Sequence, residues 1–210
     1  MEKWLRILSK VYSVLLYPML MPVYGMGLFC AGIVRITPSL PKAYLWLCMC
    51  GTIVLTVVIP VLLLLYLKHK GRISSLYLDD QDERKIPYVY TLVCYGFWAY
   101  FLRGTMGLPD LMLWVSLGAI VALGIVTVVN RWWKISAHLT GMGGLLGGVC
   151  SYALYYSVLP SGLMASLLLA ALVLMYARIY LGAHTALQVV CGMLVGLVST
   201  FLPSMIMSYA

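Results

Sequence analysis

Residues 111–129 read LMLWVSLGAIVALGIVTVV, a run of nineteen residues without a single charge. A helix that spans a bilayer needs about 20 predominantly apolar residues. The strands of a membrane barrel would instead alternate apolar and polar side chains over about 10 residues. Because every backbone N–H and C=O must be paired internally in hydrocarbon, this continuous run predicts a transmembrane α-helix.

The composition extends this interpretation to the whole chain. Of the 210 residues, 63% are hydrophobic and only 10% are charged, whereas soluble globular domains are about half apolar and about a quarter charged. A water-soluble enzyme, a disordered chain, a coiled coil and a disulfide scaffold are therefore excluded. The six cysteines all lie in apolar runs, where they act most simply as small hydrophobic side chains. We expect an all-α polytopic membrane helical bundle that forms one domain over residues 1–210.

Six or seven transmembrane helices are predicted. Pro18 and Pro22 predict that the first helix starts with a kink or with an interfacial segment around Trp4 and Tyr12. Arg103 shortens the third, which leaves a re-entrant segment as the alternative there. No small-x-small cleavage site follows a short apolar core at the N-terminus, so we expect the first helix to remain. The predicted spans are approximately 13–35, 43–67, 88–106, 111–129, 138–159, 162–181 and 184–203.

The basic residues predict the orientation of the bundle. With seven spans, the N-terminus and the loops at 68–87, 130–137 and 178–183 share one side. That side carries eleven of the fourteen basic residues, and the other side carries Arg35, Lys42 and Arg103. The positive-inside rule makes the richer side cytoplasmic, so we expect a multi-pass protein of a bacterial cytoplasmic membrane. Basic residues dispersed over short loops predict contacts with membrane lipids and no nucleic-acid binding. The eleven are Lys3, Arg6, Lys10, Lys68, Lys70, Arg72, Arg84, Lys85, Arg131, Lys134 and Arg178.

One acidic loop admits two interpretations. Asp79, Asp80, Asp82 and Glu83 directly precede Arg84 and Lys85. The simpler interpretation is a solvated loop that neutralises its own charge. The alternative is a magnesium-diphosphate site of a prenyl-diphosphate enzyme, because carboxylates at this density bind hard cations. Intramembrane prenyltransferases use such loops in pairs, and Asp110 is predicted on the opposite side of the membrane.

Two of the three histidines occupy junctions between a loop and a helix on the same side. His69 lies between lysines and is most simply a surface residue. Ser136 is a natural N-cap, and His138 would then fall in the first helical turn, where free N–H groups favour an anion. His184 and Gln188 are four residues apart and so share one helix face. Gly192 and Gly196 continue that face, and a similar small-residue face after His138 contains Gly143 and Gly147. Such faces usually serve close helix packing.

These residues resemble the signatures of the type 2 phosphatidic acid phosphatase superfamily, within about residues 80–196. Ser136-Ala137-His138 is similar to the Ser-Gly-His core of the second signature. Arg178, His184 and Gln188 have the spacing of the third, Ser-Arg-x5-His-x3-Asp. Arg84-Lys85-Ile86-Pro87 is a partial match to the first, Lys-x6-Arg-Pro. Ala137, Ala177 and Gln188 replace the glycine, serine and aspartate of these signatures.

The resemblance implies a lipid phosphatase that needs neither metal nor cofactor. His184 would be the nucleophile that forms a phosphohistidine, His138 the general acid, and Gln188 the residue that orients His184. Positive charge around the phosphoryl oxygens, together with a neutral imidazole near pH 7, suits this chemistry. The substrate would be a phosphomonoester or diphosphate of an amphipathic lipid. Because Gln188 carries no charge, a relative that only binds or transports a phosphorylated lipid remains the alternative. The phosphate-binding residues would be Arg178, Ser136, Lys134 and one of Arg84 and Lys85.

Overall fold

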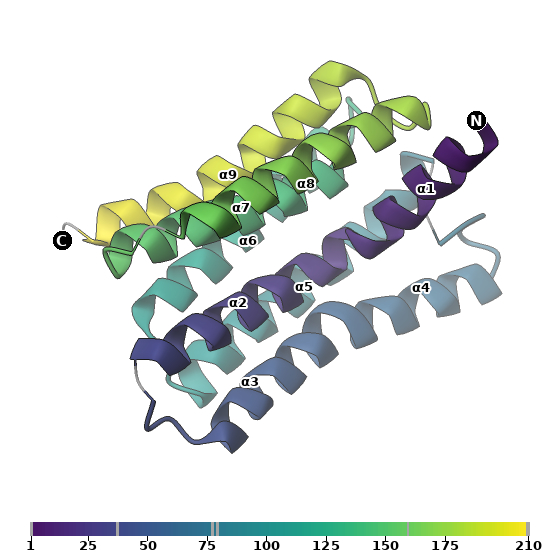
Figure 1. Cartoon of the computed structure of the whole chain (residues 1–210). Coiled ribbons are helices and arrows are strands. Elements are labelled where there is room, and N and C mark those ends of the chain that lie inside the picture. Colours follow the sequence, from purple (N-terminus) through teal and green to yellow (C-terminus); the bar gives the residue numbers. More distant parts are fainter. Residues whose placement is uncertain (1, 37, 77, 79, 159, 209–210) are drawn as a thin grey trace.

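The computed structural model describes residues 2–36, 38–76, 78, 80–158 and 160–208, which form helices and no strand (Figure 1). The first rod consists of α1 (Glu2–Leu15), a single 3-10 turn η1 (Pro18–Leu20) and α2 (Met21–Ile36). Pro18 has no N–H to donate to the preceding turn, so α1 ends just before it. The predicted kink lies there, although the helix already begins at Glu2.

The second rod joins α3 (Lys42–Ile53), a π-helical segment η2 (Val54–Val58) and α4 (Ile59–His69). Its irregular segment directly precedes Pro60, which cannot donate the backbone hydrogen bond of a regular helix. π-Helical segments are rare and occur mostly as single turns inside α-helices, as this one does. The rod therefore continues through the proline, as the second predicted span does.

The remaining rods follow in chain order. They are α5 (Lys85–Tyr100) with the π-helical segment η4 (Phe101–Thr105), α6 (Asp110–Val129), α7 (Ala137–Tyr155), α8 (Ser161–Tyr180) and α9 (Ala186–Ser208). An ion pair of 2.9 Å joins Arg103 of η4 to Asp110 at the start of α6. The charge of Arg103 shortens the third predicted span. In the structure, this charge has an acidic partner across the connecting loop.

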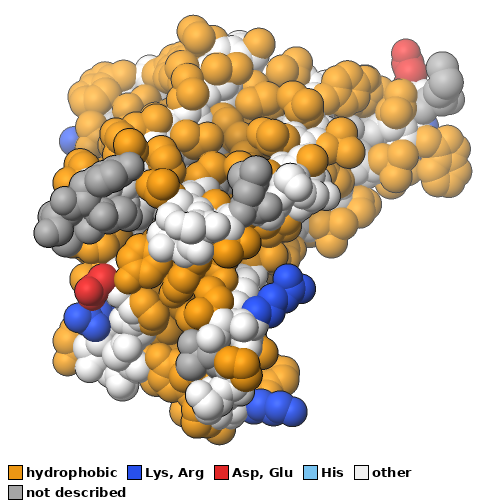
Figure 2. Space-filling view, turned by 60° about the vertical axis from the view of Figure 1, so that its left-hand side comes forward, with side chains coloured by type: hydrophobic (Ala, Val, Ile, Leu, Met, Phe, Trp, Pro, Cys, Tyr) orange, Lys and Arg blue, Asp and Glu red, His pale blue; other side chains and the backbone are white. Residues whose placement is uncertain are grey.

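Five helical stretches of the described residues are long and apolar enough to cross a membrane. They are Glu2–Ile36, Lys42–His69, Asp110–Val129, Ser161–Tyr180 and Ala186–Ile206. Hydrophobic side chains cover most of the face seen in Figure 2, with Lys and Arg near its margins. The chain thus has the helices and the apolar surface of a multi-pass membrane protein.

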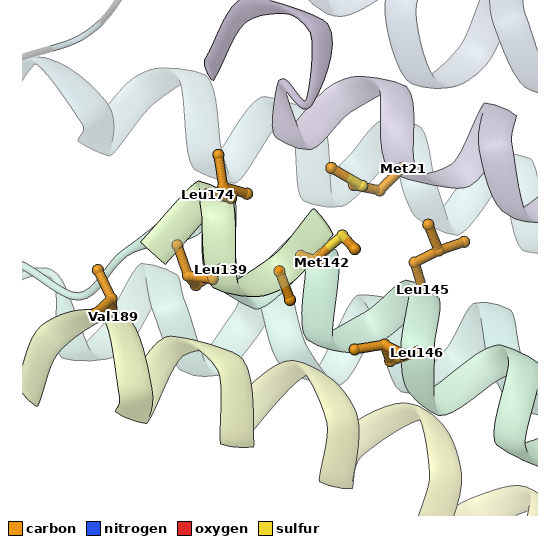
Figure 3. Close-up of a cluster of buried hydrophobic side chains, with 8 residues drawn as sticks. Met21, Leu139, Met142, Leu145, Leu146, Leu174 and Val189 are labelled. Carbon is orange, nitrogen blue, oxygen red and sulfur yellow. The ribbon is translucent and has the colours of Figure 1, made fainter. Parts of the chain in front are cut away.

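The centre of the bundle is α7, which packs against α2, α6, α8 and α9. Buried side chains from four helices meet around it, among them Met21, Met142, Leu174 and Val189 (Figure 3). A Cβ on Gly196 of α9 would lie against the Thr140 carbonyl of α7. Glycine therefore lets the two helix backbones approach each other directly, as the small-residue faces predict.

Candidate phosphoryl-transfer site

The second motif lies where the chain enters α7. Ser136 occupies the N-cap position with extended backbone, at φ −84° and ψ 103°, but its hydroxyl makes no capping hydrogen bond. The side-chain cap expected of Ser136 is therefore absent. Its Oγ is fully buried and has no hydrogen-bond partner among the described residues. His138 follows in the first turn of α7 and is also buried.

The third motif lies in the tight turn between α8 and α9. Gly182 adopts φ +66°, a left-handed conformation that suits glycine. The Gly182 N–H donates to the Ile179 carbonyl at 2.9 Å, and the Ala183 N–H donates to the Arg178 carbonyl at 3.1 Å. This pair of bonds is the Schellman motif that ends many helices. It ends α8 at Tyr180 and turns the chain back, so that the His184 N–H donates to the Arg178 carbonyl at 3.4 Å.

A reciprocal capping box starts α9. The Gln188 N–H donates to Thr185 Oγ1 at 3.4 Å, and the Thr185 N–H donates to Gln188 Oε1 at 3.1 Å. The second bond identifies the amide atom as the oxygen. That oxygen also lies 3.2 Å from Nδ1 of His184.

These contacts determine the tautomer of His184. Its Nδ1 lies 3.2 Å from two acceptors, Gln188 Oε1 and the Lys134 carbonyl. Nδ1 must therefore carry the proton and donate to them, which leaves the lone pair on Nε2. A histidine that attacks phosphorus through Nε2 needs this arrangement. Gln188 supplies the orienting acceptor without supplying a charge.

The two cationic residues of the first motif, Arg84 and Lys85, lie in different environments. Arg84 is buried, and its Nε donates to the Leu78 carbonyl at 2.8 Å. The side chain of Lys85 is 59% exposed and pairs with Asp82 at 2.8 Å. Of the two predicted phosphate ligands, the structure brings Arg84 to the other motifs and leaves Lys85 on the surface. Tyr88, one helical turn after Arg84, interacts with the Arg84 and Arg178 guanidiniums.

Side chains from these three segments surround one end of a cavity of about 500 Å³. Its polar end is lined by Arg84, Tyr88, His138, Arg178 and His184. Its walls further along α2, α5, α6 and α7 are mainly apolar, and include Met26, Phe29, Trp98, Val115 and Leu145. One further cation, Arg35 in the last turn of α2, also lines it. The cavity is thus amphipathic, with a cationic end and a hydrocarbon-like interior.

The environment of His184 keeps its imidazole neutral. Burial lowers the pKa of His184 to about 4, and the Arg178 and Arg84 guanidiniums act in the same direction. The hydrogen bonds to Gln188 and to the Lys134 carbonyl oppose this shift without reversing it. Near pH 7, the Nε2 lone pair is therefore available.

His138 is held from the α1 side. The Tyr17 ring meets the His138 ring edge-on, with a centroid separation of 5.4 Å and an interplanar angle of 85°. The Ser13 backbone hydrogen-bonds the His138 side chain, and both Arg178 and His184 are near enough to interact with it electrostatically. The first rod of the bundle thereby covers the second motif.

The acidic loop forms its contacts locally. Asp80 accepts a hydrogen bond from the Asp82 N–H, and Glu83 accepts bonds from the Ser74 N–H and hydroxyl. Asp79 lies outside the described residues. Within the part of the chain that the structure describes, no group of three His, Cys, Asp or Glu side chains could hold a metal ion.

Four contributors to the site were missed by the sequence analysis. Thr185 is the most readily found, because Thr-x-x-Gln before an apolar run is a capping-box signature. Tyr88 lies four residues after Arg84 and shares its helix face. Ser13 and Tyr17 reach His138 only through packing of distant helices, for which the local sequence has no signal. Comparisons with known protein families, curated proteins and solved structures find no match.

Proposed function

We propose that this protein is a membrane-embedded phosphatase of amphipathic lipid phosphates, similar in mechanism to the type 2 phosphatidic acid phosphatases. One observation carries the proposal. His138, Arg178, His184 and Arg84 come from three segments distant in sequence, and all line the cationic end of one apolar cavity. Ionisable groups at membrane depth are costly, so their convergence favours a functional site.

The proposed reaction has two steps. The negative charge of the bound phosphate would favour protonated His138. The Nε2 lone pair of His184 attacks phosphorus, the phosphorus–oxygen bond to the lipid breaks, and His138 gives its proton to the departing oxygen. Water then attacks the phosphohistidine while His138 removes a proton from it. The phosphorus–nitrogen bond breaks, which releases inorganic phosphate and restores neutral His184.

The cations would stabilise the transferring phosphoryl group. Phosphoryl transfer depends chiefly on positioning and on positive charge around the equatorial oxygens. Arg84 and Arg178, which line the cavity, supply that charge. The Ser136 hydroxyl is buried at the N-cap of α7 outside the cavity lining, and it would have to turn toward the cavity to donate to a phosphoryl oxygen. The apolar part of the cavity would take the lipid tail, which restricts the substrate to amphipathic phosphates.

The same proposal includes a topology. The five apolar helices, together with α5 and α7, would give seven crossings, with the motif-bearing loops on the cytoplasmic side. Contacts between these loops support their placement at one end of the bundle. Asn130 Nδ2 donates to the Gln81 carbonyl at 3.0 Å, and the Ser136 N–H donates to the Gln188 carbonyl at 3.3 Å.

The test is release of inorganic phosphate from a lipid monophosphate by purified protein in the presence of a metal chelator. His184→Ala should reduce turnover by more than about 10³-fold, because it removes the nucleophile. His69→Ala makes the same chemical change at an exposed histidine and should retain activity. Equal activity in the two variants would overturn the assignment of His184.

A protein that binds or transports phosphorylated lipids is the second candidate, favoured by the uncharged Gln188. A phosphohistidine carries more positive charge than the free imidazole, and a carboxylate at position 188 would stabilise it. Gln188→Asp should therefore raise the turnover of an enzyme. In a protein that only binds phosphorylated lipids, the same substitution should produce no turnover at all.

A further inference from the structure

A second cavity, of about 410 Å³, adjoins the proposed site on the side of α1. It shares His138 and Arg178 with the apolar cavity, and its other charged residues are Arg6, Lys10 and Lys134. No Asp or Glu lines it among the described residues. The two cavities thus meet at the general acid and at one of the phosphate-binding arginines.

The faces of α1 explain how its cations reach this cavity. Arg6, Lys10 and Ser13 have helical spacing that places them on one face, and all three line the cavity. The opposite face is apolar and exposed, with Trp4 at 70% and Leu8 at 61%. Arg6 and Lys10 are themselves exposed, and both line a cavity that the helix forms with the rest of the bundle. Ser13, on the same face, is buried.

Contacts to α8 hold α1 in this orientation. The Tyr12 hydroxyl donates to the Ala170 carbonyl at 3.2 Å, and the Tyr180 hydroxyl donates to the Glu2 carbonyl at 3.4 Å. Arg6 and Lys10 lie between these two attachment points, and Ser13 directly follows the second. The cationic face is therefore fixed toward Arg178.

The cationic lining of this cavity favours binding of an anion. Like charges at close range repel one another, and an opposite charge within about 4–6 Å offsets this repulsion. The ion pairs of the described residues involve neither Arg6 nor Lys10. A concentration of cations next to a site built for a phosphoryl group matches the chemistry of a second phosphate.

We propose that this cavity, lined by Arg6, Lys10, Lys134, His138 and Arg178, is a second phosphate-binding site. Its ligand is either the inorganic phosphate released at His184 or the phosphate of an anionic lipid headgroup. The first of these roles rests on the proposed function, because it makes the cavity the aqueous exit for the product. Binding of phosphate itself does not depend on catalysis.

The experiment counts bound phosphate. Protein in phosphatidylcholine nanodiscs is dialysed against radiolabelled inorganic phosphate, and the binding isotherm is fitted for the number of sites. Wild-type protein should show two classes of site, and Arg6→Gln/Lys10→Gln should lose one of them or weaken it at least tenfold. The control, Lys3→Gln/Arg72→Gln, also removes one lysine and one arginine, but from exposed positions that do not line the cavity. It should keep both classes.

A second experiment distinguishes the two possible ligands, released inorganic phosphate and the phosphate of a lipid headgroup. In phosphatidylglycerol nanodiscs, a headgroup that occupies the cavity should displace the second class of inorganic phosphate, whereas an exit site should retain it. Either result supports the site. Identical isotherms for Arg6→Gln/Lys10→Gln and its control in phosphatidylcholine would overturn it. Two classes of bound phosphate without release of phosphate from lipid phosphates would reject the proposed function and leave this site standing.

Discussion

Replacing Gln188 by Glu exchanges one orienting amide for a carboxylate of almost the same shape. The Thr185 N–H donates to Gln188 Oε1 at 3.1 Å and can donate equally to a carboxylate, so the capping box is retained. The new negative charge would lie where Gln188 Oε1 now lies, 3.2 Å from Nδ1 of His184. The substitution therefore tests the electrostatics of the histidine with little change in its geometry.

The size of the effect follows from this distance. Two opposite unit charges 3.2 Å apart attract by about 5 kcal/mol at an effective dielectric constant of about 20, and by about 1 kcal/mol in bulk water. Each pKa unit corresponds to about 1.4 kcal/mol. An opposite charge favours the imidazolium, so the pKa of His184 should rise from about 4 into the range of about 5 to 8.

The assay is an NMR titration of protein that carries ¹³C-labelled histidine in detergent micelles. The signal of His184 is identified by its absence in His184→Ala, and the measurement needs no substrate. Ser161→Asp adds the same charge at the other end of α8 and should leave the titration of His184 unchanged. A His184 pKa in Gln188→Glu within about 0.5 of the wild-type value would refute the contact between these side chains, because even the smallest expected change is about one pKa unit.

Three further predictions concern packing, the phosphate ligands and pH. Gly196→Ala places a Cβ against the Thr140 carbonyl and should lower the free energy of unfolding by about 1–3 kcal/mol or more. Gly124→Ala enters open space and should be neutral or stabilising in thermal unfolding in detergent; equal effects of the two would contradict the close α7–α9 packing. Arg84→Gln should reduce kcat/KM by about 10²–10³-fold, since it removes a buried donor to the phosphoryl group. Lys85→Gln should stay within about threefold, and the reverse order would contradict the assignment. The pKa of His184 is about 4 in the folded protein and about 6.5 when unfolded, so the unfolded state binds more protons between these values. Stability should therefore fall as the pH is lowered from 6.5 to 4, and this fall should be smaller in His184→Ala.

The sequence predicted the helical class because long apolar runs in this composition admit few other structures. It also predicted which segments form rods, including the irregular region near Pro18. The π-helical segment before Pro60 was not predicted. It did not predict that helix begins at Glu2, because α1 is amphipathic and contains three basic residues. A search for continuous apolar runs does not detect such a helix.

The candidate site, like the fold, was predicted from the sequence only in part. The spacing of Arg178, His184 and Gln188 predicted that His184 and Gln188 are neighbours, and the 3.2 Å contact agrees with this. The sequence did not distinguish Arg84 from Lys85. The distinction depends on which side chain the loop before α5 buries, and Arg84 becomes buried through its bond to the Leu78 carbonyl.

Contacts between distant rods could not be predicted from one sequence. Ser13 and Tyr17 reach His138 because α1 and η1 cross the start of α7, a feature of tertiary packing with no local pattern. Ser136 was predicted as the N-cap of α7 and occupies that position, but its hydroxyl makes no capping hydrogen bond. The hydroxyl is buried without a partner among the described residues, and Ser136 lines neither cavity.

The most direct test of the account is to trap the covalent intermediate. The experiment uses the His138→Ala variant and a radiolabelled aryl phosphate, whose leaving group needs no proton. This substrate should transfer its phosphoryl group to His184. The intermediate should then persist, because the variant lacks the base that activates the attacking water. Mass spectrometry of the rapidly quenched protein should then find phosphate on His184 and on no other residue. Phosphate release without a modified His184, or a label on another side chain, would contradict the claim that His138 and His184 act on the same phosphoryl group.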